Sequence, residues 1–173
     1  MRHRCLWVLL ALSGVLTLAP ATLAKSAARA ANPGQAFFHD ALIADSKTTS
    51  AIRDALKAKT AIVDPVITYA DLTGDSKSDA VVRVHSTGAA GVIAVYVFST
   101  DGNSKGTLRA VFRSQRLFRA VTAVTAANLR IDTADYKAGD ELCCPSELTR
   151  RIYTWSAKAH EFRRTSLTTV KNP

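Results

Sequence analysis

Acidic and hydroxyl side chains recur at alternate positions in the segment DLTGDSKSDA, residues 71–80. Calcium prefers oxygen ligands, and a tight loop that points every second residue inward can supply several of them. In such a loop Asp71, Thr73 and Asp75 would offer side-chain oxygens, Lys77 its carbonyl and Asp79 a closing carboxylate. The spacing therefore predicts one Ca²⁺ site.

The segment resembles the calcium loop D-x-[D/N]-G-D-G-x-x-D, which precedes a strand in FG-GAP repeats and in similar EF-hand-like loops of extracellular proteins. Thr73 stands where the pattern has a stronger ligand and Ser76 where it has a glycine, so the expected affinity is low. The pattern occurs once, which excludes a propeller. The alternative is a hairpin loop in which Asp71, Asp75 and Asp79 accept hydrogen bonds from the backbone.

A second chemically distinctive segment, GDELCCPSE at residues 139–147, contains the adjacent Cys143 and Cys144. Neighbouring cysteines can close an eight-membered disulfide ring that fixes a sharp turn. A disulfide to another chain and two reduced buried thiols are the alternatives. A redox role would usually present C-x-x-C, which the sequence lacks, so a structural vicinal disulfide is predicted.

The pairing of DLTGD…DAVV with GD…CCPS…RxYxW resembles a type of small secreted bacterial protein of unassigned function. The resemblance spans roughly residues 60–162. It implies a shared fold and supplies no catalytic residue.

Residues 1–24 have the layout of a secretory signal peptide, with a basic start, an apolar stretch and then small residues. Cleavage after Ala24 or after Ala30 fits equally well. Cys5 precedes the apolar stretch, so it is not placed to become the lipidated first residue of a mature lipoprotein. No second apolar stretch approaches the roughly 20 residues that cross a bilayer. We expect a secreted or periplasmic protein without a transmembrane anchor.

After cleavage at Ala24 the chain keeps 21 basic and 14 acidic residues, a net charge of +7. This charge suits an anionic envelope component or an acidic partner protein, and it equally suits a solubilising surface. Arg109, Arg113, Arg119 and Arg151 are the candidates for a partner-binding patch, because alternation along strands can bring them to one face. Few aromatic residues interleave with them, which disfavours nucleic acid.

No metalloprotease, nucleophile-elbow or nucleotide-loop motif is present. His39, His85 and His160 have no ligand spacing. The sequence therefore predicts a non-enzymatic exported protein that binds a partner. One alternative is a secreted, hydrolase-like enzyme, which a cluster of His, Asp and Arg in a deep pocket would favour. Another is an inhibitor or immunity-like protein that acts through the Cys143–Cys144 loop.

The elements that position these residues can be read from periodicity. After a flexible leader at 25–33, apolar residues at helical spacing predict helices within 34–46 and 46–60, at the start of a single domain over 34–173. Eight short β-branched and aromatic runs then alternate with turns, at residues 66–72, 80–86, 91–99, 107–114, 118–125, 128–136, 149–156 and 161–170. The connections are too short for crossover helices. We predict an α+β fold with one or two N-terminal helices on an antiparallel meander of seven or eight strands, its strand 91–99 covered on both faces.

Overall fold

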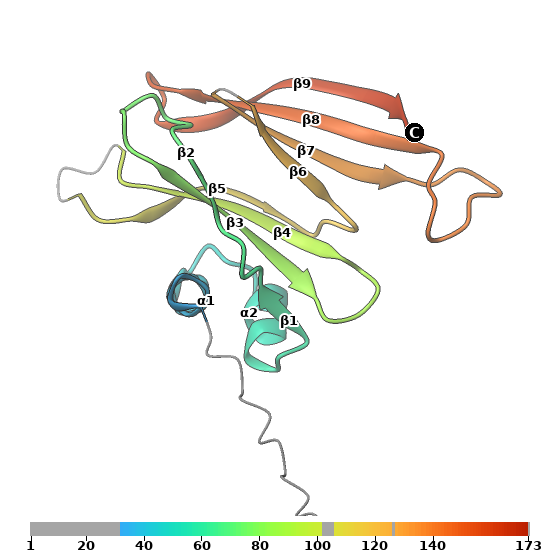
Figure 1. Ribbon diagram of the computed structural model, residues 1–173, viewed down its shortest axis with the longest axis horizontal. Helices are drawn as coiled ribbons and strands as arrows, with labels where there is room; N and C mark the ends of the chain where they lie inside the picture. Colours follow the sequence, from blue (N-terminus) through green and yellow to red (C-terminus); the bar gives the residue numbers. More distant parts are fainter. Residues whose placement is uncertain (1–31, 102–105, 126, 173) are drawn as a thin grey trace, which may run out of the picture. The chain divides into compact units, whose positions relative to one another are not determined.

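The computed structural model describes residues 32–101, 106–125 and 127–172, and all of them belong to one unit, residues 31–173. The predicted signal peptide, and the predicted leader up to residue 31, lie outside the described residues. The fold is α+β, as predicted, and the described residues form two helices followed by nine strands (Figure 1).

Two short helices open the described chain, α1 (Pro33–Ala44) and α2 (Ser50–Lys57). The first begins at a proline that needs no hydrogen-bond partner, and the Asn32 side chain caps it by accepting from Gly34 N at 3.0 Å. Each helix buries one pair of residues four apart, Phe38 with Leu42 and Ile52 with Leu56. That spacing gives each helix one apolar stripe, which faces the sheet.

All nine strands pair in antiparallel fashion, and each of the eight predicted runs contains or overlaps one of them. The remaining strand precedes Asp64 and Pro65 and is too short to give a period-two pattern. The strands are β1 (Ala61–Val63), β2 (Thr68–Ala70), β3 (Asp79–Ser86), β4 (Val92–Ser99), β5 (Arg109–Gln115), β6 (Val121–Thr125), β7 (Asn128–Asp135), β8 (Glu147–Ser156) and β9 (Glu161–Lys171).

The prediction of one continuous meander is wrong, because the strands form two sheets. The first sheet has the order β1-β3-β4-β5, with β2 also paired to β3. The second has the order β6-β7-β8-β9. The chain therefore leaves one sheet and starts the other between β5 and β6.

The break between the sheets lies at residues 116–120. Arg116 and Arg119 both have positive φ angles, 64° and 48°, a conformation that interrupts an extended strand. The link instead runs along the start of β4, with Arg119 N donating to Ala90 O and Ala120 N to Val92 O. The alternation of apolar and polar residues in this segment does not predict the break.

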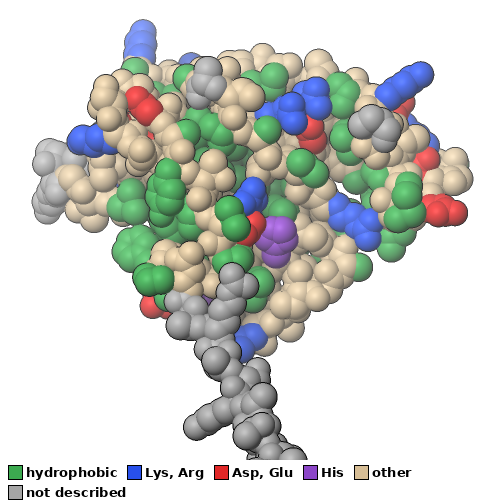
Figure 2. Space-filling model, viewed as in Figure 1, with side chains coloured by type: hydrophobic (Ala, Val, Ile, Leu, Met, Phe, Trp, Pro, Cys, Tyr) green, Lys and Arg blue, Asp and Glu red, His purple; other side chains and the backbone are tan. Residues whose placement is uncertain are grey.

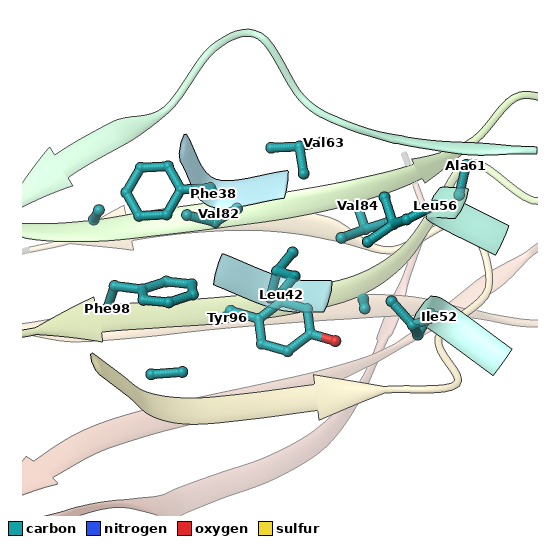
Figure 3. Packing of buried hydrophobic residues seen from close by; sticks show 13 residues of the cluster. Phe38, Leu42, Ile52, Leu56, Ala61, Val63, Val82, Val84, Tyr96 and Phe98 are labelled. Carbon is teal, nitrogen blue, oxygen red and sulfur yellow. The ribbon is translucent and has the colours of Figure 1, made fainter. Parts of the chain in front are cut away.

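Strand β4 is covered on both faces, as predicted. Tyr96 and Phe98 face the helices, where they pack with Phe38 and Leu42 (Figure 3). Burial raises the pKa of Tyr96 to about 12. The opposite face of the first sheet packs on the second sheet, in a cluster that contains Val81, Val95, Val97, Phe112, Leu129 and Ile131. The helices, the first sheet and the second sheet thus form three successive layers.

Candidate functional site

A hollow of about 330 Å³ lies at the border between the two sheets. One wall comes from β3 and from the link between β1 and β2, and the other from the start of β6. The lining residues are Asp64, Val66, Arg83, His85, Val92, Ala120, Val121 and Thr122. An acid, a guanidinium and an imidazole thus share one hollow with several apolar side chains.

Asp64 is the centre of the polar wall. Its Oδ2 lies 2.9 Å from Arg83 Nε and 3.2 Å from His85 Nε2. Its Oδ1 accepts from Val66 N at 2.8 Å, and its own backbone N–H donates to Arg83 O. Arg83 also donates from Nη2 to Val66 O at 2.9 Å. These contacts tie the link between β1 and β2 to β3 and fix the carboxylate in place.

The strand geometry explains why Arg83 and His85 meet the same partner. Residues two apart on a strand point to the same face, here the one toward the second sheet, while Val82 and Val84 pack toward the helices. The pairing of β3 with β4 shifts register between Val84 and His85. Such bulges re-aim a side chain at the border of a sheet.

Exposed apolar residues flank the polar cluster on both walls of the hollow. Val66, in the link between β1 and β2, is 63% exposed, and Val121, at the start of β6, is 57% exposed. On the face shown in Figure 2, a histidine side chain lies beside a basic and an acidic one, with hydrophobic side chains around them. An apolar surface with a few convergent polar groups is the usual composition of a ligand site.

The carboxylates of the predicted calcium loop accept hydrogen bonds from backbone N–H groups of the same loop. Asp79 is buried, and its Oδ2 accepts from Leu72 N at 2.8 Å and from Thr73 N at 2.9 Å. Asp71 accepts from Gly74 N and Ser76 N, and Asp75 from Lys77 N. Within the described residues, these three aspartates do not bring their oxygens within 4.8 Å of one another. This arrangement fits the hairpin alternative better than an ion cage, and Ca²⁺ binding stays a prediction.

The four arginines of the predicted patch lie at separate places. Arg109 and Arg113 line a hollow beside α1, where the guanidinium of Arg113 lies 2.7 Å from the Asp45 carboxylate. Arg119 donates to the carbonyls of Ala89 and Leu142 from the link between the sheets. Arg151, on β8, donates to Thr133 Oγ1 at 2.8 Å. The structure therefore brings only Arg109 and Arg113 to the same hollow. A role of the four arginines in partner binding stays a prediction.

Cys143 and Cys144 form the predicted vicinal disulfide, in the loop between β7 and β8. Both residues are exposed, whereas the following Pro145 is buried. The described residues thus hold one disulfide, and it joins immediate neighbours.

The cluster around Asp64 was not predicted from the sequence. The signal that was available is the pair Arg83-x-His85 on a predicted strand, which places both side chains on one face. The position of Asp64 beside them could not be predicted from the sequence, because it depends on the pairing of the short strand β1 with the end of β3. A contact between residues 21 positions apart cannot be read from local spacing.

The chain has a distant relative among known proteins. No protein-family model and no solved structure matches the chain. A lipoprotein, CseA of Streptomyces avermitilis, is 33% identical over 114 residues, which cover 65% of this chain and 51% of the lipoprotein. The chain thus spans about half the length of this curated relative. Among the residues that the structure describes, no helix is both long and apolar enough to span a membrane.

Proposed function

We propose that this chain is a non-enzymatic binding protein of the bacterial cell envelope, and that the hollow around Asp64 receives its partner. Similarity to a lipoprotein is consistent with an envelope location and supports that part of the proposal. The observation that carries the proposal is the hollow itself, where a fixed polar cluster faces two exposed valines.

The state of the polar cluster favours binding over catalysis. Oδ1 of Asp64 accepts from Val66 N, and Oδ2 is in ion-pair contact with Arg83 Nε and lies 3.2 Å from His85 Nε2. A cluster held in this way orients its groups before a ligand arrives, which lowers the cost of ordering on binding. We infer that Arg83 and His85 bind a polar group of the partner. Val66 and Val121 would then pack against an apolar group of the same partner.

Charge supports an anionic partner. The described residues from 106 onward contain 12 basic and six acidic side chains, a net charge of +6. Those from 32 to 101 contain six basic and eight acidic ones, a net charge of −2. Such asymmetry steers an anionic molecule toward the part of the chain that contains the second sheet. The start of β6, which forms one wall of the hollow, belongs to this basic part.

A second candidate function is that of a hydrolase-like enzyme, which the contact of His85 Nε2 with Asp64 Oδ2 at 3.2 Å favours. An imidazole oriented by a carboxylate is the arrangement of a general base. Among the described residues that line the hollow, Thr122 supplies the one hydroxyl, and there is no serine or cysteine. Without a marked nucleophile, the binding function is the better supported of the two.

A capture experiment from native envelope extracts tests the proposal. Val121→Glu places a charge at the mouth of the hollow, and because the side chain is more than half exposed, the fold should tolerate it. Phe37→Glu is the matched control, since Phe37 is 53% exposed on α1 and does not line the hollow. We expect Val121→Glu to lose a partner that the wild type and Phe37→Glu both retain. Equal capture by all three would contradict the proposal, and recovery of a cleaved partner would favour the enzyme.

A further inference from the structure

The loop between β7 and β8 contains a second chemically reactive cluster, separate from the hollow. Glu141, Cys143 and Cys144 place one carboxylate oxygen and two sulfurs within 4.8 Å of one another, and all three residues are exposed. Cys143 Sγ lies 3.5 Å from Glu141 Oε2. No other group of three or more His, Cys, Asp or Glu ligands comes together in the described part of the chain.

A purely structural role explains this disulfide poorly. A disulfide stabilises a fold mainly by restricting the unfolded chain, and the effect grows with the number of residues in the loop that it closes. Cys143 and Cys144 are adjacent, so the bond closes the smallest loop possible and joins no distant segments. Its removal should therefore change the stability of the whole domain little.

The loop is held in place by side chains other than the cysteines. The carboxylate of Asp140 accepts from Lys137 N at 2.8 Å, and from both the N–H and the hydroxyl of Ser146, at 2.9 Å and 3.0 Å. These backbone donors hold the pKa of Asp140 below its usual value. Asn172 donates from Nδ2 to Pro145 O at 2.9 Å.

The tip of the loop is fixed in the same way. Leu142 O accepts from the Tyr136 hydroxyl at 2.7 Å and from the guanidinium of Arg119. Cys144 N donates to Glu141 O at 2.9 Å. Because none of these contacts uses a sulfur, the backbone that carries Glu141, Cys143 and Cys144 should keep its shape when the disulfide opens.

We propose that the reduced loop is a binding site for a soft or borderline metal ion, with Cys143, Cys144 and Glu141 as its ligands. Opening the site takes two electrons and two protons from a dithiol reductant, which becomes a disulfide while Cys143 and Cys144 become thiols. The ion then displaces both thiol protons to solvent. The disulfide and the bound ion exclude each other, so the loop binds metal only under reducing conditions.

The ligand set decides the class of metal. Thiolates select Zn²⁺, Cd²⁺ or Cu⁺ over Ca²⁺ and Mg²⁺, which require oxygen ligands. Three protein ligands leave a coordination position open for water or for a ligand from another molecule. Exposure of all three residues gives the ion direct access from solvent.

The test uses the purified protein, with Cys5→Ala where residues 1–24 are still present, so that Cys143 and Cys144 are its remaining cysteines. Alkylation without reductant should label neither thiol. After reduction with a phosphine, Cd²⁺ is titrated, with the thiolate-to-cadmium charge-transfer absorption as the readout and circular dichroism as the check on folding. We expect one Cd²⁺ per chain for the reduced protein and none for the oxidised protein.

Variants separate a built site from adventitious thiol chemistry. Cys144→Ser should abolish the charge-transfer signal of one ion bound by two thiolates, and Glu141→Gln should weaken Cd²⁺ binding about tenfold or more. Glu147→Gln is the matched control, since Glu147 pairs with Lys137 at the end of the same loop and is not part of the cluster. Equal affinity in Glu141→Gln and the wild type, binding by the oxidised protein, no binding by the reduced protein, or loss of folding on reduction would each overturn the proposal.

Discussion

The two polar loops of this chain, residues 71–79 and 136–146, use aspartate in the same way and differ in what they leave exposed. In the first loop, Asp71, Asp75 and Asp79 all accept from backbone N–H groups of the loop. In the second, Asp140 alone performs that task, and Glu141 and both cysteines remain at the surface. The carboxylates of the first loop therefore stabilise the loop's own backbone, while the second loop leaves a carboxylate and two sulfurs exposed to a ligand.

The same residue type can close a turn or serve a site, depending on where the backbone donors lie. Asp79 is the first residue of β3 and lies beneath the loop, where it is only 1% exposed. A carboxylate in that position must be satisfied by the protein, because burying it without partners is costly. The spacing of the aspartates does not show that Asp79 is buried. For that reason the sequence pattern predicts an ion site, whereas in the structure the carboxylates bind the loop backbone.

The largest expected effect comes from breaking the first loop at Asp79. Asp79→Ala removes the acceptor of Leu72 N and Thr73 N and leaves both donors buried, which should cost about 3 kcal/mol in the free energy of unfolding. Asp75→Ala is the control, since it loses one bond near the surface and should cost less than about 1 kcal/mol. Urea denaturation measures both, and equal losses would show that Asp79 does not hold the loop.

A smaller effect is expected when the second loop loses its anchor. Arg119→Ala removes the guanidinium that donates to Leu142 O and Ala89 O, and it should cost about 1 kcal/mol of stability. Amide exchange should accelerate in residues 136–146 and remain unchanged in residues 71–79. If exchange accelerated equally in both loops, Arg119 would act on the whole domain and not on the second loop.

The pH dependence distinguishes the loops further. Hydrogen bonds from Lys137 N and Ser146 N lower the pKa of Asp140 from 3.8, so its stabilising contribution is fully present above the unfolded value and is lost as the pH falls through the folded one. The stability difference between the wild type and Asp140→Asn should be constant above about pH 5 and should shrink below pH 3.8. A difference that persists unchanged in acid would mean that the charge of Asp140 is not what holds the loop.

The smallest expected effect concerns Ca²⁺ at the first loop. Both oxygens of Asp71 accept from backbone N–H groups, and Oδ1 of Asp79 accepts from the Thr73 hydroxyl. If the loop is a hairpin turn and not an ion site, millimolar Ca²⁺ should leave the melting temperature unchanged in both the wild type and Asp75→Ala. Mg²⁺ at the same concentration controls for ionic strength. A rise that is specific to Ca²⁺ in the wild type, and absent in Asp75→Ala, would establish the calcium site that the sequence predicts.

Much of the fold follows from local patterns. The two helices and eight of the strands could be placed from periodicity and turn residues, because each of those signals is contained within one short segment. The vicinal disulfide could be predicted because two adjacent cysteines have few other partners. The division into two sheets could not be predicted, because it depends on left-handed backbone at Arg116 and Arg119. Arginine has no particular preference for that conformation, so its presence in the sequence does not indicate a break.

The candidate site was less accessible to sequence reasoning than the fold. The polar wall combines the β1–β2 link with β3, and the apolar rim adds residues from β6. Each of these segments looks ordinary alone, and the hollow exists only because the second sheet packs across the first. Arg83 and His85 were visible as a pair, whereas their partner Asp64 was not.

Photo-crosslinking in living cells tests the central claim, that the hollow receives the partner of this chain, most directly. A photoreactive amino acid is placed at Val121, at the mouth of the hollow, or at Phe37, which is similarly exposed on α1 and outside it. The proposal predicts a discrete crosslinked species from Val121 that disappears when His85→Ala is added, with no matching species from Phe37. The same species from both positions, or from Val121 regardless of His85→Ala, would contradict it.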